Sequence, residues 1–197
     1  MNQSIRYFFF QFMVRPFLNT ISRFNVGGKK NLPTKGPAIL VANHNSHLDT
    51  LSLMCLFRWK TLKRVRPVGA LDYWLRNKFL SFLSRDVIGM VPIQRDRVSK
   101  KHDPFMHCHE AIQNEEILIL YPEGSRGDPE EMTNFKSGIW HFVKQYPEID
   151  VVPVYIHGLG KVLPKGSFLP VPFFCDIEVG EKVPFLDKKK EYIESIQ

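Results

Sequence analysis

One short stretch of the chain, residues 37–49, limits what the rest can fold into. Its first part, Pro37-Ala-Ile-Leu-Val-Ala42, is an apolar run that predicts a buried strand. Ser46 then stands where the N-cap of an apolar helix, Leu48 to Phe57, is expected. His44 falls between the two, so a strand and a helix hold it from both sides. Such a corner can present a histidine rigidly to a pocket.

Asp49 follows His44 by five residues, and a turn between them can bring the two side chains together. A carboxylate beside an imidazole fixes its tautomer and stabilises the imidazolium, which lets the histidine accept a proton from a hydroxyl. The same residues allow two other interpretations. Ser46 and Asp49 fit a capping box, with Asp in place of Glu or Gln, and His44, His47 and Asp49 are all possible metal ligands. This stretch alone leaves the three interpretations open.

Length and composition indicate one domain from a reducing compartment. The chain has 197 residues and is 44% hydrophobic, enough for a core of its own. Cys55, Cys108 and Cys175 lie far apart without a C-x-x-C pair, which indicates neither a disulfide framework nor a zinc ribbon. Cys108 stands between His107 and His109, but adjacent residues on a helix point in different directions. We therefore predict no metal site.

The positive charge of the chain is concentrated in its first third. Residues 1–71 hold 11 Lys/Arg against one acid, Asp49, whereas residues 72–197 hold 16 against 19, within a net charge of +7. A basic N-terminal third indicates an anionic partner: a lipid surface, a nucleic acid, or an acidic carrier or cofactor.

Residues 1–24 combine aromatic side chains with scattered arginines. Helical spacing predicts one apolar stripe, with polar residues mostly on the other side; the stripe comprises Phe10, Met13, Phe17, Ile21 and Phe24. A membrane span needs about 20 mainly apolar residues, and Gln11, Arg15 and Pro16 interrupt the run. No small-residue cleavage site follows, so a signal peptide is not indicated. We predict one helix, or two divided at Pro16, lying in a membrane interface. Packing on the domain's own core is the alternative.

Beyond a turn-rich connector at 25–36, predicted strands and helices alternate. The predicted strands are 37–42, 89–95, 117–121, 151–156 and 175–179, and the predicted helices are 48–57, 73–83, 105–114, 135–146 and one from 187 onward. Pro153 marks its strand as an edge strand or as irregular at its start. The pattern predicts an α/β fold, in which residues 25–197 form a single domain with a mixed, mostly parallel sheet flanked by helices.

The apolar strand 117–121 runs directly into Pro122-Glu-Gly-Ser-Arg-Gly127. In open α/β sheets, ligands bind beyond the carboxyl ends of the strands, which is where this loop is expected. Glycine lets backbone N–H groups approach an anion, and arginine offers a fork that matches phosphate. Arg95, at the end of another predicted strand, belongs to the same edge.

These segments together resemble the glycerolphosphate and lysophosphatidate acyltransferase family. That family carries N-H-x-x-x-x-D, an arginine ending an I-x-R strand, [FY]-P-E-G-[TS]-R, a phenylalanine-lysine-glycine element and a V-P-V strand. The matching residues are Asn43-His44 with Asp49, Ile93-Gln94-Arg95, Tyr121-Pro-Glu-Gly-Ser-Arg126, Phe135-Lys136 with Gly138, and Val152-Pro-Val154. Each motif is weak alone, but their joint occurrence over residues 25–185 is specific.

The resemblance implies transfer of a fatty acyl group from an acyl thioester to a glycerol hydroxyl. His44 would be the general base and Asp49 would orient its ring. Substrate-binding residues would come from Arg95 and the loop after strand 117–121: Arg95, Arg126 and Lys136 for the acceptor phosphate, Glu123 for an acceptor hydroxyl or an arginine, backbone N–H groups around Gly124 for the thioester oxyanion, and Ser125. No G-x-S-x-G occurs, so Ser125 is not expected to be a nucleophile.

The implied partners are a lysophospholipid acceptor, an acyl thioester donor and an anionic membrane surface, on the cytoplasmic face of a membrane and without a span across it. No cofactor is expected, since acyl-CoA or acyl carrier protein would be a co-substrate. A lipid hydrolase using His44 and Asp49 on water, or a catalytically silent lipid-surface module, is the alternative. Nucleic-acid binding is not favoured, because the aromatics of the basic third form one apolar stripe.

Overall fold

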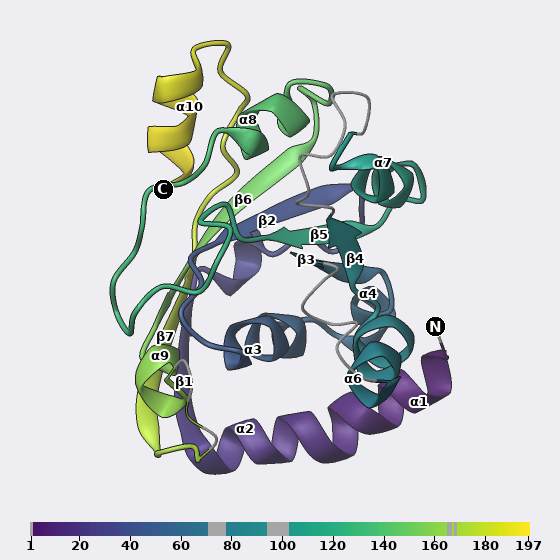
Figure 1. Ribbon diagram of the computed structural model, residues 1–197, viewed down its shortest axis with the longest axis vertical. Helices are drawn as coiled ribbons and strands as arrows, with labels where there is room; N and C mark the ends of the chain where they lie inside the picture. Colours follow the sequence, from purple (N-terminus) through teal and green to yellow (C-terminus); the bar gives the residue numbers. More distant parts are fainter. Residues whose placement is uncertain (1, 71–77, 94–102, 165–166, 168) are drawn as a thin grey trace.

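A sheet of seven strands runs through the computed structural model, which describes residues 2–70, 78–93, 103–164, 167 and 169–197 (Figure 1). The strand order is β1-β7-β6-β2-β5-β3-β4. Only the β6–β7 pair is antiparallel; the other neighbours are parallel. The strands are β1 Ser22–Gly27, β2 Ala38–Ala42, β3 Val65–Ala70, β4 Val91–Ile93, β5 Ile117–Leu120, β6 Asp150–His157 and β7 Phe173–Val179. The predicted mixed, mostly parallel sheet is confirmed.

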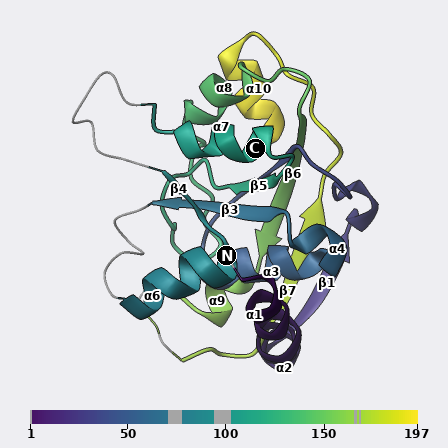
Figure 2. The ribbon, with the colours of Figure 1, turned by 90° about the vertical axis from the view of Figure 1, so that its right-hand side faces the viewer.

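Helices cover both faces of the sheet, because the apolar strands alternate their side chains between two cores. Leu40 and Ile119 face a core with α3 (Leu48–Leu56), whereas Ile39 and Leu118 face the opposite core. Figures 1 and 2 show the two layers. One side of the sheet carries the N-terminal helix, α3, α4 (Trp59–Leu62), α6 (Lys78–Phe82) with the wide turn Leu83–Ile88, and α9 (Leu159–Val162). The other side carries α7 (Met106–Gln113), α8 (Gly138–Val143) and α10 (Lys189–Ile196).

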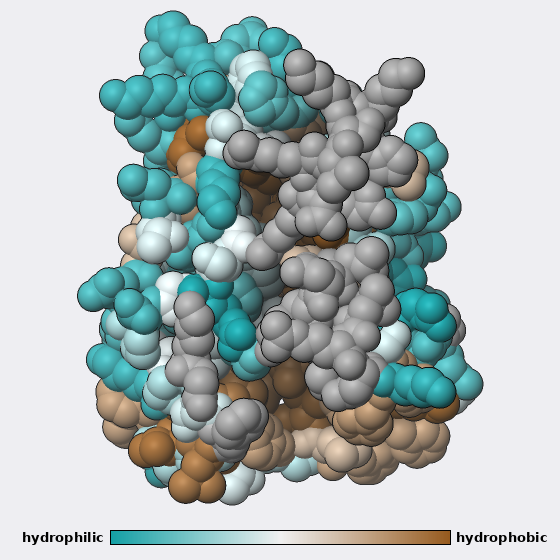
Figure 3. All heavy atoms as spheres, in the orientation of Figure 1, coloured by the Kyte–Doolittle hydropathy of each residue, from teal (hydrophilic) through white to brown (hydrophobic). Residues whose placement is uncertain are grey.

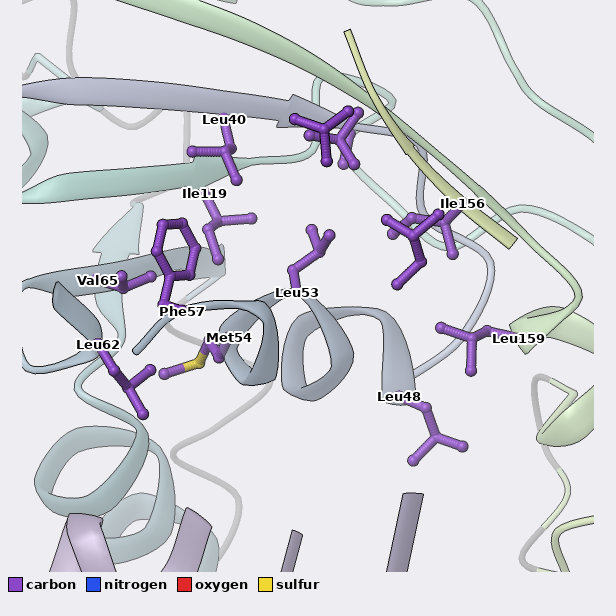
Figure 4. Packing of buried hydrophobic residues seen from close by; sticks show 14 of the residues in the cluster. Leu40, Leu48, Leu53, Met54, Phe57, Leu62, Val65, Ile119, Ile156 and Leu159 are labelled. Carbon is purple, nitrogen blue, oxygen red and sulfur yellow. The ribbon is translucent and has the colours of Figure 1, made fainter. Parts of the chain in front are cut away.

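Strand β2 and helix α3 form the centre of this arrangement. Every residue of β2 is buried, as its continuous apolar run predicts. Leu53 and Phe57 point from α3 toward Leu40 and Ile119 of the sheet (Figure 4). The corner between β2 and α3 is therefore held by packing on both sides.

Pro153 is not in an edge strand, which was one of the two roles predicted for it. Strand β6 lies between β7 and β2, and Pro153 pairs in register with Val41. The carbonyl of Pro153 accepts from the N–H of Gly180 at 2.9 Å, so its polar side is directed away from β2. The missing N–H thus costs the β2–β6 ladder nothing, because N–H and C=O of one strand residue point to the same side.

The N-terminal helix differs from prediction in its end and in its buried face. It runs from Gln3 to Ile21 as α1 (Gln3–Phe8), a wide π turn (Phe9–Val14) and α2 (Arg15–Ile21), and residues 22–24 belong to strand β1. The buried residues follow a spacing of four: Arg6, Phe10, Val14 and Leu18. Met13 and Phe17, which we placed in the same stripe as Phe10, are 62% and 43% exposed. The π turn shifts the helical phase just before Pro16, which has no N–H to donate.

This helix therefore has two apolar faces. Phe10, Val14 and Leu18 pack into the core below α3, so the expected alternative of packing on the domain itself holds for one face. A second set of side chains is exposed: Ile5, Tyr7, Phe8, Phe12, Met13 and Phe17. Among the described residues, no helix is both long enough and apolar enough to cross a membrane.

Two arginines of this helix are turned inward. Arg6 is fully buried and donates from Nη2 to the carbonyl of Val65 at 2.8 Å, and burial lowers its pKa to about 9. Arg15 donates to the carbonyl of Phe57 at 2.9 Å. Their charges anchor the helix to the domain, which leaves Arg23 and three lysines as the exposed cations among the first 36 residues.

Candidate active site

The strand-to-helix corner is built by side-chain amides that continue the sheet. Asn43 donates from Nδ2 to the carbonyl of Ile156 at 2.8 Å and accepts its N–H at 2.7 Å, as a further strand residue would. Asn43 Nδ2 also reaches Asn45 Oδ1 at 3.0 Å. Asn45 in turn donates to the carbonyls of Asp128 and Glu131, which bring the loop after β5 over the corner. Sequence reasoning missed the asparagines, although two buried amides directly after an apolar strand are a usable signal.

His44 and Asp49 are in contact at this corner. His44 Nδ1 lies 2.9 Å from Asp49 Oδ2, and Asp49 is 1% exposed. The same oxygen accepts the N–H groups of Asn45 and Ser46, both at 2.8 Å. Ser46 Oγ accepts the N–H of Leu48 at 3.3 Å. Only half of the predicted capping box is present, because the N-cap of α3 is His47 rather than Ser46. The Asp49 carboxylate that accepts the N–H of Ser46 also contacts the imidazole.

The ring of His44 is fixed by a second element, the end of β5. It stacks on Tyr121, with centroids 4.1 Å apart and planes 19° apart. The Tyr121 hydroxyl is hydrogen-bonded to Thr50 Oγ1 at 2.9 Å, and burial raises the pKa of Tyr121, so the phenol stays neutral. The His44 side chain remains 18% exposed. With Nδ1 held by Asp49, Nε2 is the nitrogen available to a substrate.

Glu123 is a buried side chain that contacts this corner from the loop after β5. It is 2% exposed, and its two oxygens are used inside the protein. Oε1 accepts the N–H of His44 at 2.7 Å, and Oε2 accepts the N–H and hydroxyl of Thr133 at 3.0 and 2.7 Å. The N–H of Gly127 closes the loop onto the carbonyl of His44 at 2.9 Å. Glu123 therefore positions His44.

Lys136 lies over Gly124 in the loop after β5. Gly124 has φ +77°, and a Cβ there would lie 2.5 Å from Lys136 Nζ, so only glycine fits. The N–H of Gly124 donates to the carbonyl of Tyr121 at 3.0 Å within the turn. This N–H is engaged in the turn, and the role of the backbone N–H groups around Gly124 toward a thioester oxyanion stays a prediction. Ser125 is exposed beside it.

Burial and the charge of Arg126 lower the pKa of His47, which lies next to the histidine–carboxylate pair. The pKa of His47 is lowered to about 4, first by burial, then by the charges of Arg126 and His44, while Asp49 opposes the shift. His47 is therefore neutral near pH 7. Arg95, the other arginine of the predicted acceptor site, lies outside the described residues.

Among the residues described, no three His, Cys, Asp or Glu side chains are arranged to hold a metal ion. A cavity of about 250 Å³ lies at the amino ends of β3 and β4, whereas His44 follows the carboxyl end of β2. Most of the charged side chains that line the cavity pair with one another, Arg66 with Glu116 and His107 with Glu110.

The chain belongs to the Acyltransferase family, whose family model matches residues 23–157. It is 30% identical over 146 residues to the chloroplastic 1-acyl-sn-glycerol-3-phosphate acyltransferase LPAT1 of Arabidopsis thaliana, a match that covers 74% of this chain and 39% of that protein. It is 26% identical over 140 residues to the human 1-acyl-sn-glycerol-3-phosphate acyltransferase beta, covering 67% of this chain and 45% of that protein. The chain thus spans less than half the length of these relatives.

The fold is similar to the crystal structure of the 1-acyl-sn-glycerophosphate (LPA) acyltransferase PlsC from Thermotoga maritima. The TM-score is 0.75 at 20% identity, over 98% of this chain and 76% of that one. At this identity the likeness concerns the fold, and it extends to the N-terminal helix as well as the sheet.

Proposed function

We propose that this chain transfers a fatty acyl group from an acyl thioester to the hydroxyl of a lysophosphatidate-type acceptor. The observation that carries the proposal is the contact between His44 and Asp49 at the carboxyl end of β2, beside the basic side chains of Arg126 and Lys136. The Arabidopsis and human relatives are both named as acyltransferases of 1-acyl-sn-glycerol 3-phosphate, which supports this acceptor class.

His44 is the proposed general base. Its Nδ1–H donates to Asp49 Oδ2, which leaves Nε2 to take the proton from the acceptor hydroxyl while that oxygen attacks the thioester carbonyl. Asp49 stabilises the imidazolium, which then returns the proton to the leaving thiolate. A positioned base typically contributes about 10²–10⁴-fold. Since the acceptor oxygen is itself the nucleophile, the reaction needs no acyl-enzyme.

The acceptor phosphate is assigned to Arg126, Lys136 and Arg95. Arginine presents two parallel N–H donors to a phosphate, and lysine adds a point charge. The donor is acyl-CoA or acyl carrier protein, and both present the same thioester to His44. Glu123 positions His44 instead of binding substrate.

We further propose that the exposed face of the N-terminal helix lies in the cytoplasmic interface of a membrane. Its exposed aromatic and aliphatic side chains would lie at the headgroup boundary while the opposite face stays in the domain core. Such an arrangement places the enzyme where a lysophospholipid is found. Anionic lipids would add to the binding through exposed Arg23 and the lysines at 29–35.

A panel assay tests the proposed function. Thioester consumption by the purified chain is measured with acyl-CoA and with acyl carrier protein as donor, against lysophosphatidate, glycerol 3-phosphate and an uncharged monoacylglycerol. The proposal predicts consumption that depends on a phosphorylated acceptor and yields the acylated lipid. Release of free fatty acid at the same rate without acceptor would identify a hydrolase and refute the proposal.

A further inference from the structure

Large hydrophobic side chains are exposed in a few segments of the molecule. Of the fifteen that are exposed in the described part of the chain, six lie on the N-terminal helix and two on α6. Four more lie in the segment before and at the start of β7, here called the β7 lead-in: Leu169, Val171, Phe173 and Phe174. Brown surface gathers along the lower edge in Figure 3, where Figure 1 places the N-terminal helix and the start of β7.

The strand register brings the β7 lead-in to the end of the N-terminal helix. The helix ends at Ile21 and runs directly into β1. Because β1 and β7 are parallel, Ser22 lies opposite Phe173 and Arg23 opposite Phe174. The exposed apolar surface of the helix is therefore continued by the lead-in at the same sheet edge.

The β7 lead-in is held in this position although it buries little of its own apolar surface. Leu169 is 78% exposed and Phe174 67%. The N–H of Val171 donates to the carbonyl of Val162 at 2.8 Å, which ties the segment to α9. Lys161 on α9 places its ammonium 5.0 Å from the centroid of the Phe173 ring. Apolar side chains presented on a tethered backbone are a feature of surfaces that meet a partner.

The lead-in is also linked to the catalytic corner. The carbonyl of Leu163, directly after α9, accepts the hydroxyl of Ser46 at 3.0 Å. Ser46 lies two residues before α3 and donates its N–H to Asp49. A short chain of hydrogen bonds therefore runs from the lead-in through α9 to the carboxylate that holds His44.

We propose that the β7 lead-in is a second lipid-contacting element, which enters the membrane interface together with the N-terminal helix. Two contacts at opposite ends of one face would set the tilt of the domain and hold the His44 corner at headgroup level. The chemistry fits a lipid surface, because each exposed aromatic of the strand start has a cation beside it, Arg23 at Phe174 and Lys161 at Phe173. The inference rests on the proposed membrane attachment for the identity of the partner.

Vesicle binding of the full chain tests this proposal. Sedimentation with phosphatidylcholine vesicles, with and without phosphatidylglycerol, compares the wild type with Leu169→Ser/Phe174→Ser and with a control, Met106→Ser/Tyr155→Ser. The control removes two exposed hydrophobic side chains outside the proposed face. Because the lead-in variant loses two apolar anchors, we expect its vesicle binding, and not that of the control, to weaken about tenfold or more. Its melting temperature should be unchanged.

Three results would overturn the inference. Equal binding by the lead-in variant and the wild type would show that the segment does not touch lipid. Equal weakening in lead-in and control variants would show a nonspecific effect. A concentration-dependent dimer of the wild type that the lead-in variant abolishes would instead assign the surface to a second copy of the chain.

A separate pair of measurements keeps this inference apart from the proposed function. Phe8→Ser/Phe12→Ser tests the N-terminal helix in the same vesicle assay, and transfer to a short-chain, water-soluble acceptor tests the chemistry. Transfer activity that is absent while the lead-in variant still loses binding would refute only the function. Binding lost in the helix variant and retained in the lead-in variant would refute only the second contact.

Discussion

Arg126 lies close enough to His47 to lower its pKa, and Lys136 lies over Gly124 in the loop that follows β5. If Arg126 holds the acceptor phosphate, Arg126→Ala removes a charged hydrogen bond worth about 1.5–3 kcal/mol. The Michaelis constant for a phosphorylated acceptor should then rise about 10- to 150-fold, with that for the thioester donor little changed. Steady-state kinetics with each substrate varied in turn checks this.

Arg58→Ala is the matched control, since Arg58 is an exposed arginine after the other end of α3. It should leave both constants unchanged. Equal loss toward donor and acceptor in Arg126→Ala, or a fall in melting temperature alone, would show that this arginine holds the loop together.

His47 predicts a dependence of stability on pH. Its folded pKa is lowered to about 4, below the unfolded value of about 6.5. Between these values the unfolded chain binds a proton that the folded chain does not, so stability falls as the pH falls from about 6.5 to 4. His47→Gln, which stays neutral, should lose less stability than the wild type between pH 7 and pH 5 in urea titrations. Parallel losses in the two proteins would contradict the assigned cause.

Among individual residues, the sequence predicted the contact of His44 with Asp49. It did not predict that Glu123 faces inward, because a carboxylate in a glycine-rich loop has no periodic signal that reports burial. Only the tertiary structure shows that Thr133 and the His44 backbone supply its donors.

The N-terminal helix contacts the domain core with one apolar face and exposes a second apolar face. Phe10 is 1% exposed and Phe12 is 63% exposed, two residues apart on the same π turn. Phe10→Ala should lower the free energy of unfolding by about 3–5 kcal/mol, because it opens a cavity below α3. Phe12→Ala should change it by less than about 0.5 kcal/mol and weaken vesicle binding instead.

Chemical denaturation and vesicle sedimentation of the two variants give this comparison. Similar stability losses would contradict the assignment of the two faces. The periodicity of residues 1–24 predicted a helix correctly but placed Phe10, which is buried, in one stripe with Met13 and Phe17, which are exposed. The π turn changes the rotation per residue, and a run in which aromatics occupy both faces cannot reveal such a shift.

In the whole molecule, the first 24 residues are part of the folded domain and not only a candidate membrane contact. They supply three buried apolar side chains, two inward arginines and the start of an edge strand. A chain that begins at Asn25 should therefore lose cooperative unfolding, because the surface below α3 would be opened to water. Thermal denaturation and limited proteolysis of this truncation are the tests. A truncated chain that melts like the wild type would show that the helix is an independent attachment.

The α/β class and the mostly parallel sheet followed from alternating apolar segments, but the strand order did not. Pro153 argued for an edge, whereas its strand is interior, since tertiary pairing placed the missing N–H away from β2. Strand β1 was assigned to a helix end and a connector, because its two alternating apolar residues, Phe24 and Val26, are too few to indicate a strand before β7 pairs with them.

The central claim is that His44 is a general base oriented by Asp49. Single-turnover acyl transfer to lysophosphatidate by His44→Ala and Asp49→Asn, each checked for an unchanged fold, tests it directly. Asparagine keeps an oxygen for the N–H groups of Asn45 and Ser46, so α3 should remain capped. We predict transfer reduced about 10²–10⁴-fold in His44→Ala and severely in Asp49→Asn, at near-native stability. A His44→Ala chain that retains a tenth of the normal rate, or an Asp49→Asn chain that loses stability but transfers normally, would contradict the account.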